Sequence, residues 1–239
     1  MGSILASPQC VIRFIVHGRT QPRKSELRSM KRSFYCIHVK RTLDLFGAFL
    51  ALLFLWPCIL LLYCLLRLSI GPPVFFRQMR PGFLGKPFGI YKFRSMREGR
   101  DIDGHLLPDE LRITRMGRII RAWSLDELPE LFNVLKGEMS FVGPRPLMNQ
   151  YLERYTPEQA RRHEAMPGIT GWAQIHGRNS LTWDEKFLLD VWYVDHQSFM
   201  LDLRILAVTA WKVLRREGIS QEGYIAASEF MGSKPSISK

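Results

Sequence analysis

The stretch LFLWPCILLLYC, residues 53–64, lies inside an uncharged apolar run that extends from Leu45 to Leu66. A bilayer core of about 30 Å needs about 20 helical residues, so this run is long enough to cross a membrane. Pro57 cannot donate the hydrogen bond expected four residues back, and its ring crowds that carbonyl group. We therefore expect a helix with a kink at Trp56 and Pro57, and neither half of a kinked helix is long enough to span a bilayer alone.

Both flanks of the apolar run are basic, and no Asp or Glu occurs between Asp44 and Glu98. Lys and Arg beside a membrane helix tend to stay on the cytoplasmic side, whereas acidic residues matter little. A simple crossing would export one of the two basic flanks. We therefore expect a re-entrant helix that enters the membrane, bends at Pro57 and leaves on the same face, with a kinked single crossing as the alternative.

The composition allows a membrane element and one compact domain, because the chain has 239 residues of which 46% are apolar. The formal net charge of +12 fits an anionic partner, which could be a phospholipid surface, a nucleic acid or a phosphate-rich substrate. The four cysteines form no disulfide framework or C-x-x-C spacing, as expected in the reducing cytoplasm. We expect a poorly ordered basic arm over residues 1–37, the membrane helix over 38–68, one cytosolic domain over 69–230 and a polar tail over 231–239.

Within the domain, the pattern predicts a β-hairpin and several helices. Residues 71–80 and 86–96 are typical of two extended segments joined by the turn PGFLG. Thr114 predicts the N-terminal cap of a short helix that runs through Arg121. The remaining expectations are a helix from about residue 124 to Gly137, a helix over residues 151–165, a loop over residues 167–179, and an amphipathic helix over residues 199–216 that can lie in the membrane interface or pack on the core.

The stretch SLDELPELFNVLKGEMSFVGPRPL, residues 124–147, places two acidic residues at the start of a helix. If Ser124 or Asp126 is the cap, Asp126 and Glu127 occupy the first turn, where exposed N–H groups and the helix dipole favour ionised carboxylates. Such a carboxylate can bind a divalent cation or attack phosphorus. The simpler interpretation is that these residues only cap the helix.

Several cationic side chains lie beside turns or in strand-like segments instead of on long helix faces: Lys92, Arg94, Arg145 and Arg178. Each alone is an ordinary surface charge. Together they suit an anionic substrate, because Arg offers a planar fork for phosphate oxygens and Lys a compact point charge. The D-x-D pattern of residues 101–103 matches a metal motif of nucleotide-sugar enzymes, but we expect it to be a loop.

In chain order, the motifs resemble those of the bacterial sugar transferases known as monotopic phosphoglycosyl transferases. The resemblance covers residues 38–212 and rests on KRTLDL before the apolar helix, GPPVFFRQMRPG, YKFRSM, RITRMGRIIRAWSLDELPELFNVLKGEMSFVGPRPL, PGITGWAQIHGRN and DVWYVDHQSFMLDLRIL. Pattern and resemblance together predict an α+β fold. It comprises a mainly helical compact catalytic domain with a small β-hairpin, anchored by an N-terminal Pro-kinked re-entrant membrane helix and interfacial amphipathic helices.

The resemblance implies transfer of a phosphosugar from a UDP-sugar to a polyprenyl phosphate such as undecaprenyl phosphate, with release of UMP. This would be the first membrane step of surface glycan assembly, as in exopolysaccharide or lipopolysaccharide biosynthesis. Asp126 would be the nucleophile that forms an aspartyl phosphosugar intermediate, and Glu127, with Asp126, would hold Mg²⁺. The residues implied in substrate binding are Lys92, Arg94, Pro144, Arg145, Pro146, Arg178 and Asp202.

The implied partners are the UDP-sugar, the polyprenyl phosphate and membrane lipids, with no nucleic acid, and a homodimer is compatible with the pattern. The implied location is the bacterial inner membrane, with the catalytic domain on its cytoplasmic face. A re-entrant helix agrees with the basic flanks described above, because both ends of the helix then stay on that face.

The chain departs from the family pattern at two positions. Trp56 stands where many members have Ser before the kink proline, and Trp has no hydroxyl that could satisfy the carbonyl group freed by Pro57. His176 replaces a more usual Asn. Other classes fit parts of the pattern: a membrane-tethered binder of nucleic acid or anionic lipid, a single-pass scaffold protein, or a sugar transferase that displaces at carbon and releases UDP instead of UMP.

Overall fold

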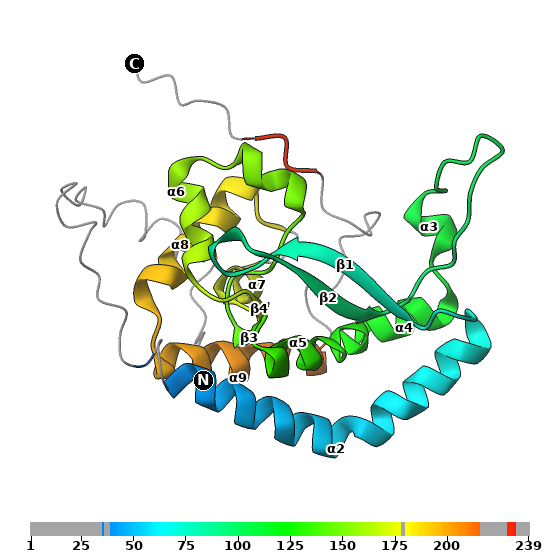
Figure 1. Cartoon of the computed structure of the whole chain (residues 1–239), viewed down its shortest axis with the longest axis horizontal. Coiled ribbons are helices and arrows are strands. Elements are labelled where there is room, and N and C mark those ends of the chain that lie inside the picture. The colour runs from blue at the N-terminus through cyan, green and yellow to red at the C-terminus, as the bar shows by residue number, and fades with distance from the viewer. Residues whose placement is uncertain (1–34, 36–38, 178–179, 216–228, 233–239) are drawn as a thin grey trace.

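The computed structural model describes Tyr35 and residues 39–177, 180–215 and 229–232. They form the expected mainly helical α+β fold, with one long helix, α2 (Lys40–Ser69), beneath a domain of short helices and two small sheets (Figure 1). In chain order the domain comprises β1 (Phe75–Pro81), η3 (Phe83–Gly85), β2 (Pro87–Phe93), α3 (Asp109–Arg112), α4 (Arg115–Ala122), η4 (Leu125–Glu127), α5 (Glu130–Lys136), β3 (Ser140–Val142), η5 (Asn149–Arg154), α6 (Pro157–Ala160), η6 (Arg161–Glu164), β4 (Gly168–Thr170), α7 (Trp172–His176), α8 (Trp183–His196) and α9 (Phe199–Arg215).

Helix α2 has 30 residues and is the one helix in the described part of the chain that is long and apolar enough to cross a membrane. It continues as a helix through Pro57, and Figure 1 shows it bowed beneath the domain. Trp56, directly before the proline, is 58% exposed. A kink at these two residues and a re-entrant course depend on the bilayer, and both stay predictions.

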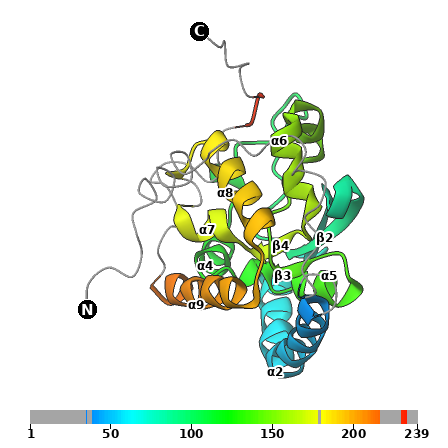
Figure 2. The ribbon, with the colours of Figure 1, turned by 90° about the vertical axis from the view of Figure 1, so that its left-hand side faces the viewer.

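The N-terminal end of α2 is bound to α9 by a buried ion pair. Nζ of Lys40 lies 2.5 Å from Oδ2 of Asp202, and the two side chains are 8% and 7% exposed. The hydroxyl groups of Tyr35 and Tyr193 donate to the same carboxylate, at 2.6 Å and 2.7 Å. A buried charge is tolerated when it is paired and hydrogen-bonded in this way. The start of α2 therefore has one defined position beside α9, as Figures 1 and 2 show.

The first turns of α2 also bind backbone groups of the domain. Arg41 donates from Nη1 to the carbonyl oxygen of Val134, at 2.7 Å, and from Nη2 to that of Leu135, at 3.2 Å. These carbonyl groups lie in the last turn of α5, and that of Val134 also accepts from the N–H group of Gly137, at 3.1 Å. Asp44 accepts a hydrogen bond from the N–H group of Phe141 in β3, at 3.2 Å. The apolar helix is thus joined directly to α5 and β3.

The expected β-hairpin is confirmed. Strands β1 and β2 pair in antiparallel register from Phe75 opposite Phe93 to Pro81 opposite Pro87. The turn PGFLG forms η3, in which Leu84 has a positive φ of 53°. The hairpin, α2 and α5 share one buried cluster, which comprises Ala48, Phe88, Ile90, Val134 and Met139.

The loop expected over residues 167–179 is wrong for most of its described part. Gly168–Thr170 form β4, which pairs in parallel with β3, and Trp172–His176 form α7. The two strands approach closely: a Cβ atom on Gly143 would lie 2.1 Å from the carbonyl oxygen of Met166. Strands of three residues are too short to show an alternating pattern, which is why the sequence resembles a loop.

Helix α4 begins and ends as expected, whereas α5 ends as expected but begins later. Thr114 caps α4 by accepting from a backbone N–H three residues on, at 2.9 Å, and Gly137 ends α5 with a φ of 85°. Neither of the two candidate caps, Ser124 and Asp126, caps α5: Ser124 makes no cap bond and has a φ of 53°, and the residue at the N-cap position of α5 is Pro129. Helix α5 begins only at Glu130, directly after Pro129. The acidic pair therefore occupies the separate 3-10 turn η4.

The helix expected over residues 151–165 is divided into three short elements. η5 ends at Arg154, and Thr156 then caps α6, which begins at Pro157. Proline suits the first turn of a helix, so it begins a new helix here instead of continuing the old one. The amphipathic helix expected at the C-terminal end is confirmed as α9, Phe199–Arg215.

The described segment 229–232 packs on the domain. Phe230 is 2% exposed and contacts four aromatic rings at centroid distances of 4.9 to 5.9 Å, those of Tyr151, Tyr155, Trp183 and Phe187. Arg154 donates from Nη1 to the carbonyl oxygen of Phe230, at 2.5 Å. This short segment is therefore part of the folded domain.

Replacing Phe230 with Ala should lower the free energy of unfolding by about 3–5 kcal/mol, because the change empties a filled aromatic site. Met231→Ala is the matched control: Met231 is 76% exposed, and we expect a change within about 0.5 kcal/mol. Denaturant unfolding of the detergent-solubilised protein, followed by tryptophan fluorescence, measures both variants. Equal stability of the two would contradict the docking of Phe230.

Candidate active site

The acidic pair and two cations from distant segments meet in one cluster. Asp126 and Glu127 lie in η4, Lys92 lies in β2, and Arg145 lies in the loop after β3. Oε1 of Glu127 accepts hydrogen bonds from Nζ of Lys92, at 2.8 Å, and from Nη2 of Arg145, at 2.5 Å. The Glu127 side chain is only 12% exposed. The fold thus places one cation from a strand and one from a loop in contact with the same carboxylate.

A third carboxyl group, that of Glu130, lies on the other side of Lys92. Its Oε1 is 3.0 Å from Nζ of Lys92, and its side chain is 1% exposed. The same oxygen is buried without a hydrogen bond in the described structure, so the contact with Lys92 is an ion pair without hydrogen-bond geometry. One ammonium group therefore serves two buried carboxyl groups, and it satisfies Glu127 better than Glu130.

This arrangement shifts the pKa values of the three carboxyl groups differently. Burial, together with the charge of Glu127, raises the pKa of Asp126. Burial also acts to raise the pKa of Glu127, but Arg145 and Lys92 outweigh it and hold that pKa below its usual range. Burial raises the pKa of Glu130 to about 7, although Lys92 acts in the opposite direction. Glu127 is therefore held ionised, whereas the other two carboxyl groups keep protons more readily.

Asp126 differs from Glu127 in its contacts. Within the described part of the chain, its carboxylate has no hydrogen-bond or ion-pair partner. Arg121 is close enough for its charge to lower the pKa of Asp126, and its Nε donates to Oγ of Ser95 at 2.8 Å. A carboxylate without a partner is available as a nucleophile, whereas one bonded to two cations is held as a fixed charge. The geometry thus separates two chemical roles.

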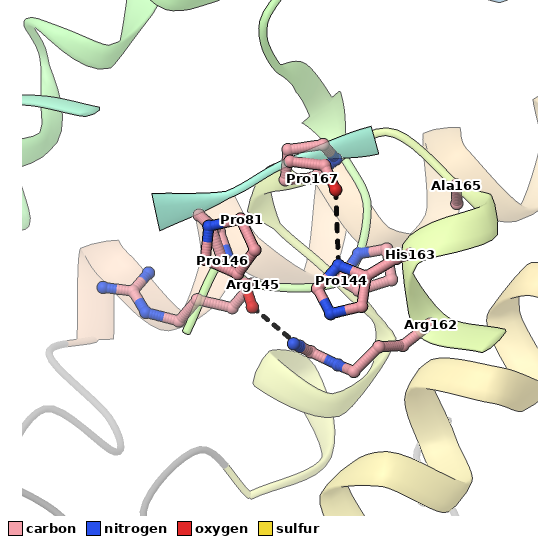
Figure 3. Close-up of a pocket in the computed structure, with 9 residues that line it drawn as sticks. Pro81, Pro144, Arg145, Pro146, Arg162, His163, Ala165 and Pro167 are labelled. Atoms are coloured by element: carbon pink, nitrogen blue, oxygen red, sulfur yellow. Dashed lines mark hydrogen bonds between the residues drawn. The ribbon is translucent and has the colours of Figure 1, made fainter. Parts of the chain in front are cut away.

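A shallow pocket lies on the backbone side of Arg145 (Figure 3). The Arg145 side chain extends away from the pocket in Figure 3, whereas its carbonyl oxygen faces Arg162. The predicted pocket residues Pro144 and Pro146 both line it, next to His163. Burial lowers the pKa of His163 to about 4, so this imidazole is neutral near pH 7.

Two of the residues predicted for substrate binding have other contacts. Arg94 donates from Nη2 to the carbonyl oxygens of Ile70, Gly71 and Pro72, at 3.4, 3.0 and 3.1 Å, and so binds the segment that follows α2. Asp202 is buried against Lys40 at the opposite end of α2. Arg178 lies outside the described residues. Of the predicted cations, Lys92 and Arg145 are the two that the structure brings to the acidic pair.

Three charged residues near the cluster are not singled out by the sequence pattern: Arg80, Arg121 and Glu130. The charges of Arg145 and Glu130 act on the pKa of Arg80, and the charge of Arg121 acts on Asp126. These residues stand in the stretches MRPG, RIIRAW and DELPE, inside the longer motifs that carry the family resemblance. Their position in those stretches was an available signal, but the direction of each side chain depends on the fold.

Asp126 and Glu127 could supply some, but not all, of the ligands of a magnesium ion. Among the described residues, no three His, Cys, Asp or Glu side chains form a group that could hold a metal. Mg²⁺ in proteins is commonly held by one or two carboxylates, with waters and substrate phosphates as the other ligands. Asp126 and Glu127 are neighbours in one turn, and the Asp126 carboxylate is not engaged by another described residue. The pair therefore fits an ion that is shared with a phosphate-bearing substrate.

The fold and the cluster define a class: an enzyme with a carboxylate and cation centre, joined to one helix of membrane-crossing length. Such a centre suits phosphate chemistry next to a lipid surface. Residues 35–216 match the family model described as bacterial sugar transferase. The chain belongs to the bacterial sugar transferase family, and the resemblance found in the sequence is confirmed.

Individual relatives agree with this assignment. The chain is 57% identical over 195 residues to the uncharacterized sugar transferase EpsL of Bacillus subtilis (strain 168), which covers 82% of this chain and 96% of the relative. It is 40% identical over 194 residues to the UDP-glucose:undecaprenyl-phosphate glucose-1-phosphate transferase of Xanthomonas campestris pv. campestris, which covers 77% of this chain and 40% of the relative.

A third relative, at 35% identity over 199 residues, is the UDP-N-acetylgalactosamine-undecaprenyl-phosphate N-acetylgalactosaminephosphotransferase of Aeromonas hydrophila. The match covers 80% of this chain and 47% of the relative. The chain thus spans nearly all of the Bacillus relative but less than half the length of the two relatives that are named for a reaction.

Replacing Glu130 with Gln should change how stability depends on pH. A carboxyl group whose pKa is raised on folding destabilises the folded state as pH rises from its unfolded pKa near 4.5 towards 7. The wild type should therefore lose stability relative to Glu130→Gln across this interval, by about 1.4 kcal/mol per pH unit. Denaturant unfolding from pH 5 to pH 8 measures the difference, with the exposed Glu98→Gln as control. Parallel curves for wild type and Glu130→Gln would contradict the shift.

Proposed function

We propose that the chain transfers a phosphosugar from a UDP-sugar to a polyprenyl phosphate, such as undecaprenyl phosphate, and releases UMP. The observation that carries the proposal is the carboxylate of Asp126, which no other described residue binds, beside Glu127, which Lys92 and Arg145 hold. The relatives from Xanthomonas and Aeromonas are named for transfers of this type, which supports the proposal. The reaction would take place at the cytoplasmic face of the bacterial inner membrane.

In the proposed first step, an oxygen of Asp126 attacks the sugar-bearing phosphorus of the donor. The new bond joins that oxygen to phosphorus, and the bond from phosphorus to the bridging oxygen breaks, so UMP leaves with the electron pair. In the second step, a phosphate oxygen of the polyprenyl phosphate attacks the same phosphorus and releases Asp126 as a free carboxylate. A carboxylate whose pKa is raised by burial is more nucleophilic than one in water, and Asp126 is such a group.

The attack of a carboxylate on a diphosphate brings like charges together, so the site must neutralise them. Lys92 and Arg145 reach the acidic pair from outside η4, and their fixed positions suit the phosphate oxygens of the donor. Mg²⁺, held by Asp126 and Glu127 together with the diphosphate, would supply further positive charge and hold the leaving group. Arg80 and Arg121, which lie close to the cluster, would neutralise the remaining negative charge of the donor diphosphate.

The lipid acceptor explains why this site is joined to an apolar helix. A polyprenyl phosphate keeps its phosphate at the headgroup plane, whereas a nucleotide sugar stays in the aqueous phase. Large apolar side chains are exposed on both α2 and α9, among them Phe46, Phe54, Leu203 and Trp211. Figures 1 and 2 show these helices side by side along one edge of the domain. A membrane that covers this edge would bring the acceptor near η4 without burying the domain.

Asp126→Asn should abolish turnover and the covalent intermediate, because an amide cannot form the acyl phosphate. Mass spectrometry of the enzyme with UDP-sugar alone should show a phosphosugar adduct on the wild type and none on Asp126→Asn. Asp103→Asn, in the loop between β2 and α3, is the control and should keep both adduct and turnover. An active wild type that releases UDP and forms no adduct would support displacement at carbon and contradict this mechanism.

Glu127→Gln should retain the nucleophile but weaken the steps that depend on metal. We expect turnover to fall by about 100-fold or more, with a higher Mg²⁺ concentration needed for half-maximal rate. A magnesium titration of UMP release from wild type and variant measures this. Identical magnesium dependence in the two proteins would remove Glu127 from the proposed metal site.

Both ends of α2 should lie on the cytoplasmic side of the membrane. Single cysteines at Thr42 and Leu68, in a chain whose native cysteines are replaced by Ala, report the two ends. A re-entrant helix predicts that a membrane-impermeant maleimide labels neither position in intact cells and both after permeabilisation. Labelling of one end in intact cells would instead establish a single crossing.

A further inference from the structure

A buried ion pair lies next to the backbone of Arg145 and has no role in the proposed reaction. Arg162 of η6 donates to Oδ2 of Asp190 in α8, from Nε at 3.0 Å and from Nη2 at 2.8 Å. Their side chains are 2% and 6% exposed. Burying two charges is costly, and replacing such a pair with apolar residues is often neutral or stabilising. A contribution to stability therefore does not by itself explain why this buried ion pair is present.

The same guanidinium makes a third contact, which leads to the active site. Nη2 of Arg162 donates to the backbone carbonyl oxygen of Arg145, at 2.7 Å. Figure 3 shows the two groups facing each other, with the Arg145 side chain extending in the other direction. That side chain reaches Oε1 of Glu127. Asp190, Arg162, Arg145 and Glu127 thus form one continuous chain of hydrogen bonds.

The backbone around Arg145 has few other means of attachment. Pro144 and Pro146 flank it, and proline has no N–H group to donate. The carbonyl oxygen of Pro144 accepts from the N–H group of Gly168, at 3.1 Å, on one side of Arg145. The bond from Arg162 supplies the anchor at Arg145 itself. Among the described residues, this is the only hydrogen bond made by a backbone group of residues 145–147, although Leu147 packs against the cluster that contains Tyr151.

We propose that Arg162, oriented by Asp190, is a positioning residue that sets where the Arg145 guanidinium meets Glu127 and the donor phosphates. The proposal rests on the function proposed above, because it deepens the role of Arg145 in that site. Arg suits this task and Lys does not: the planar fork of Arg162 bonds a carboxylate and a carbonyl oxygen at fixed angles, whereas an ammonium group has no such plane. The ring of Tyr155, whose hydroxyl lies 3.3 Å from Nη1, further limits its orientation.

A double-mutant cycle tests the proposal. Arg162→Lys should reduce kcat/KM for the UDP-sugar by about 10- to 100-fold, since a shift of about 1 Å in a positioned group has effects of that size. The loss should vanish in the background of Arg145→Ala: the double variant should be no worse than Arg145→Ala alone. Additive losses would mean that Arg162 acts on overall folding and not through Arg145, and they would overturn the proposal.

Arg161→Lys is the matched control. Arg161 is the preceding residue, and it also binds a carboxylate of α8, that of Asp195, but no hydrogen bond links it to Arg145 in the described structure. Its replacement should change kcat/KM by less than about twofold. A loss as large as that of Arg162→Lys would show a general effect of weakening the contact between η6 and α8, and would contradict the proposal.

The variant Asp190→Asn and the binding of UDP provide a second test of the same role. If Arg162→Lys fails to fold, Asp190→Asn replaces it in the cycle, because Asn keeps the shape and one acceptor oxygen. Calorimetric binding of UDP repeats the cycle without turnover. If the wild type binds UDP but releases no UMP, the proposed function is contradicted and the positioning role is still tested. The loss of UDP affinity in Arg162→Lys should then vanish in the Arg145→Ala background, and additive losses would overturn the positioning role. A wild type that neither binds UDP nor releases UMP overturns both.

Discussion

The rest of the site depends on one constraint: Glu127 must stay ionised although it is almost buried. Two cations meet this need, Lys92 from β2 and Arg145 from the loop after β3, and both bond the same oxygen. These bonds join η4, which carries Glu127, to β2 and to the loop after β3. Asp126 lies beside this ion pair and has no hydrogen-bond or ion-pair partner among the residues that the structure describes. The single short turn η4 therefore supplies both carboxyl groups, while β2 and the loop after β3 supply the fixed positive charge beside them.

Hydrogen bonds connect the apolar helix α2 to the segments on either side of η4. Arg41, in the first turn of α2, bonds the last carbonyl groups of α5, and α5 begins three residues after Glu127. At the other end, Arg94 bonds carbonyl oxygens that follow α2 and stands two residues after Lys92. Each end of the helix therefore contacts a segment that carries a residue of the cluster. The same bonds therefore fix the position of the helix relative to the acidic cluster.

Some elements could be predicted because their signals are local. The apolar run, the hairpin around PGFLG, the cap at Thr114 and the helix end at Gly137 each follow from neighbouring residues, and the structure has all of them. The short strands β3 and β4 gave no such signal, because each is only three residues long and depends on its partner. Ser124 and Asp126 were both candidate helix caps, and neither caps α5, since a residue type alone does not reveal the left-handed backbone at Ser124 or the start of the helix after Pro129.

The sequence by itself determined the apolar helix, the acidic pair and the family, because these are written in contiguous residues. Tertiary structure alone decided which cations reach Glu127, that Glu130 joins the cluster, and that Asp202 and Arg94 bind the ends of α2. It also decided that Arg162 lies against the carbonyl group of Arg145. The physical reason is that the direction of a side chain is set by the packing of segments far apart in the chain, which spacing along the sequence does not encode.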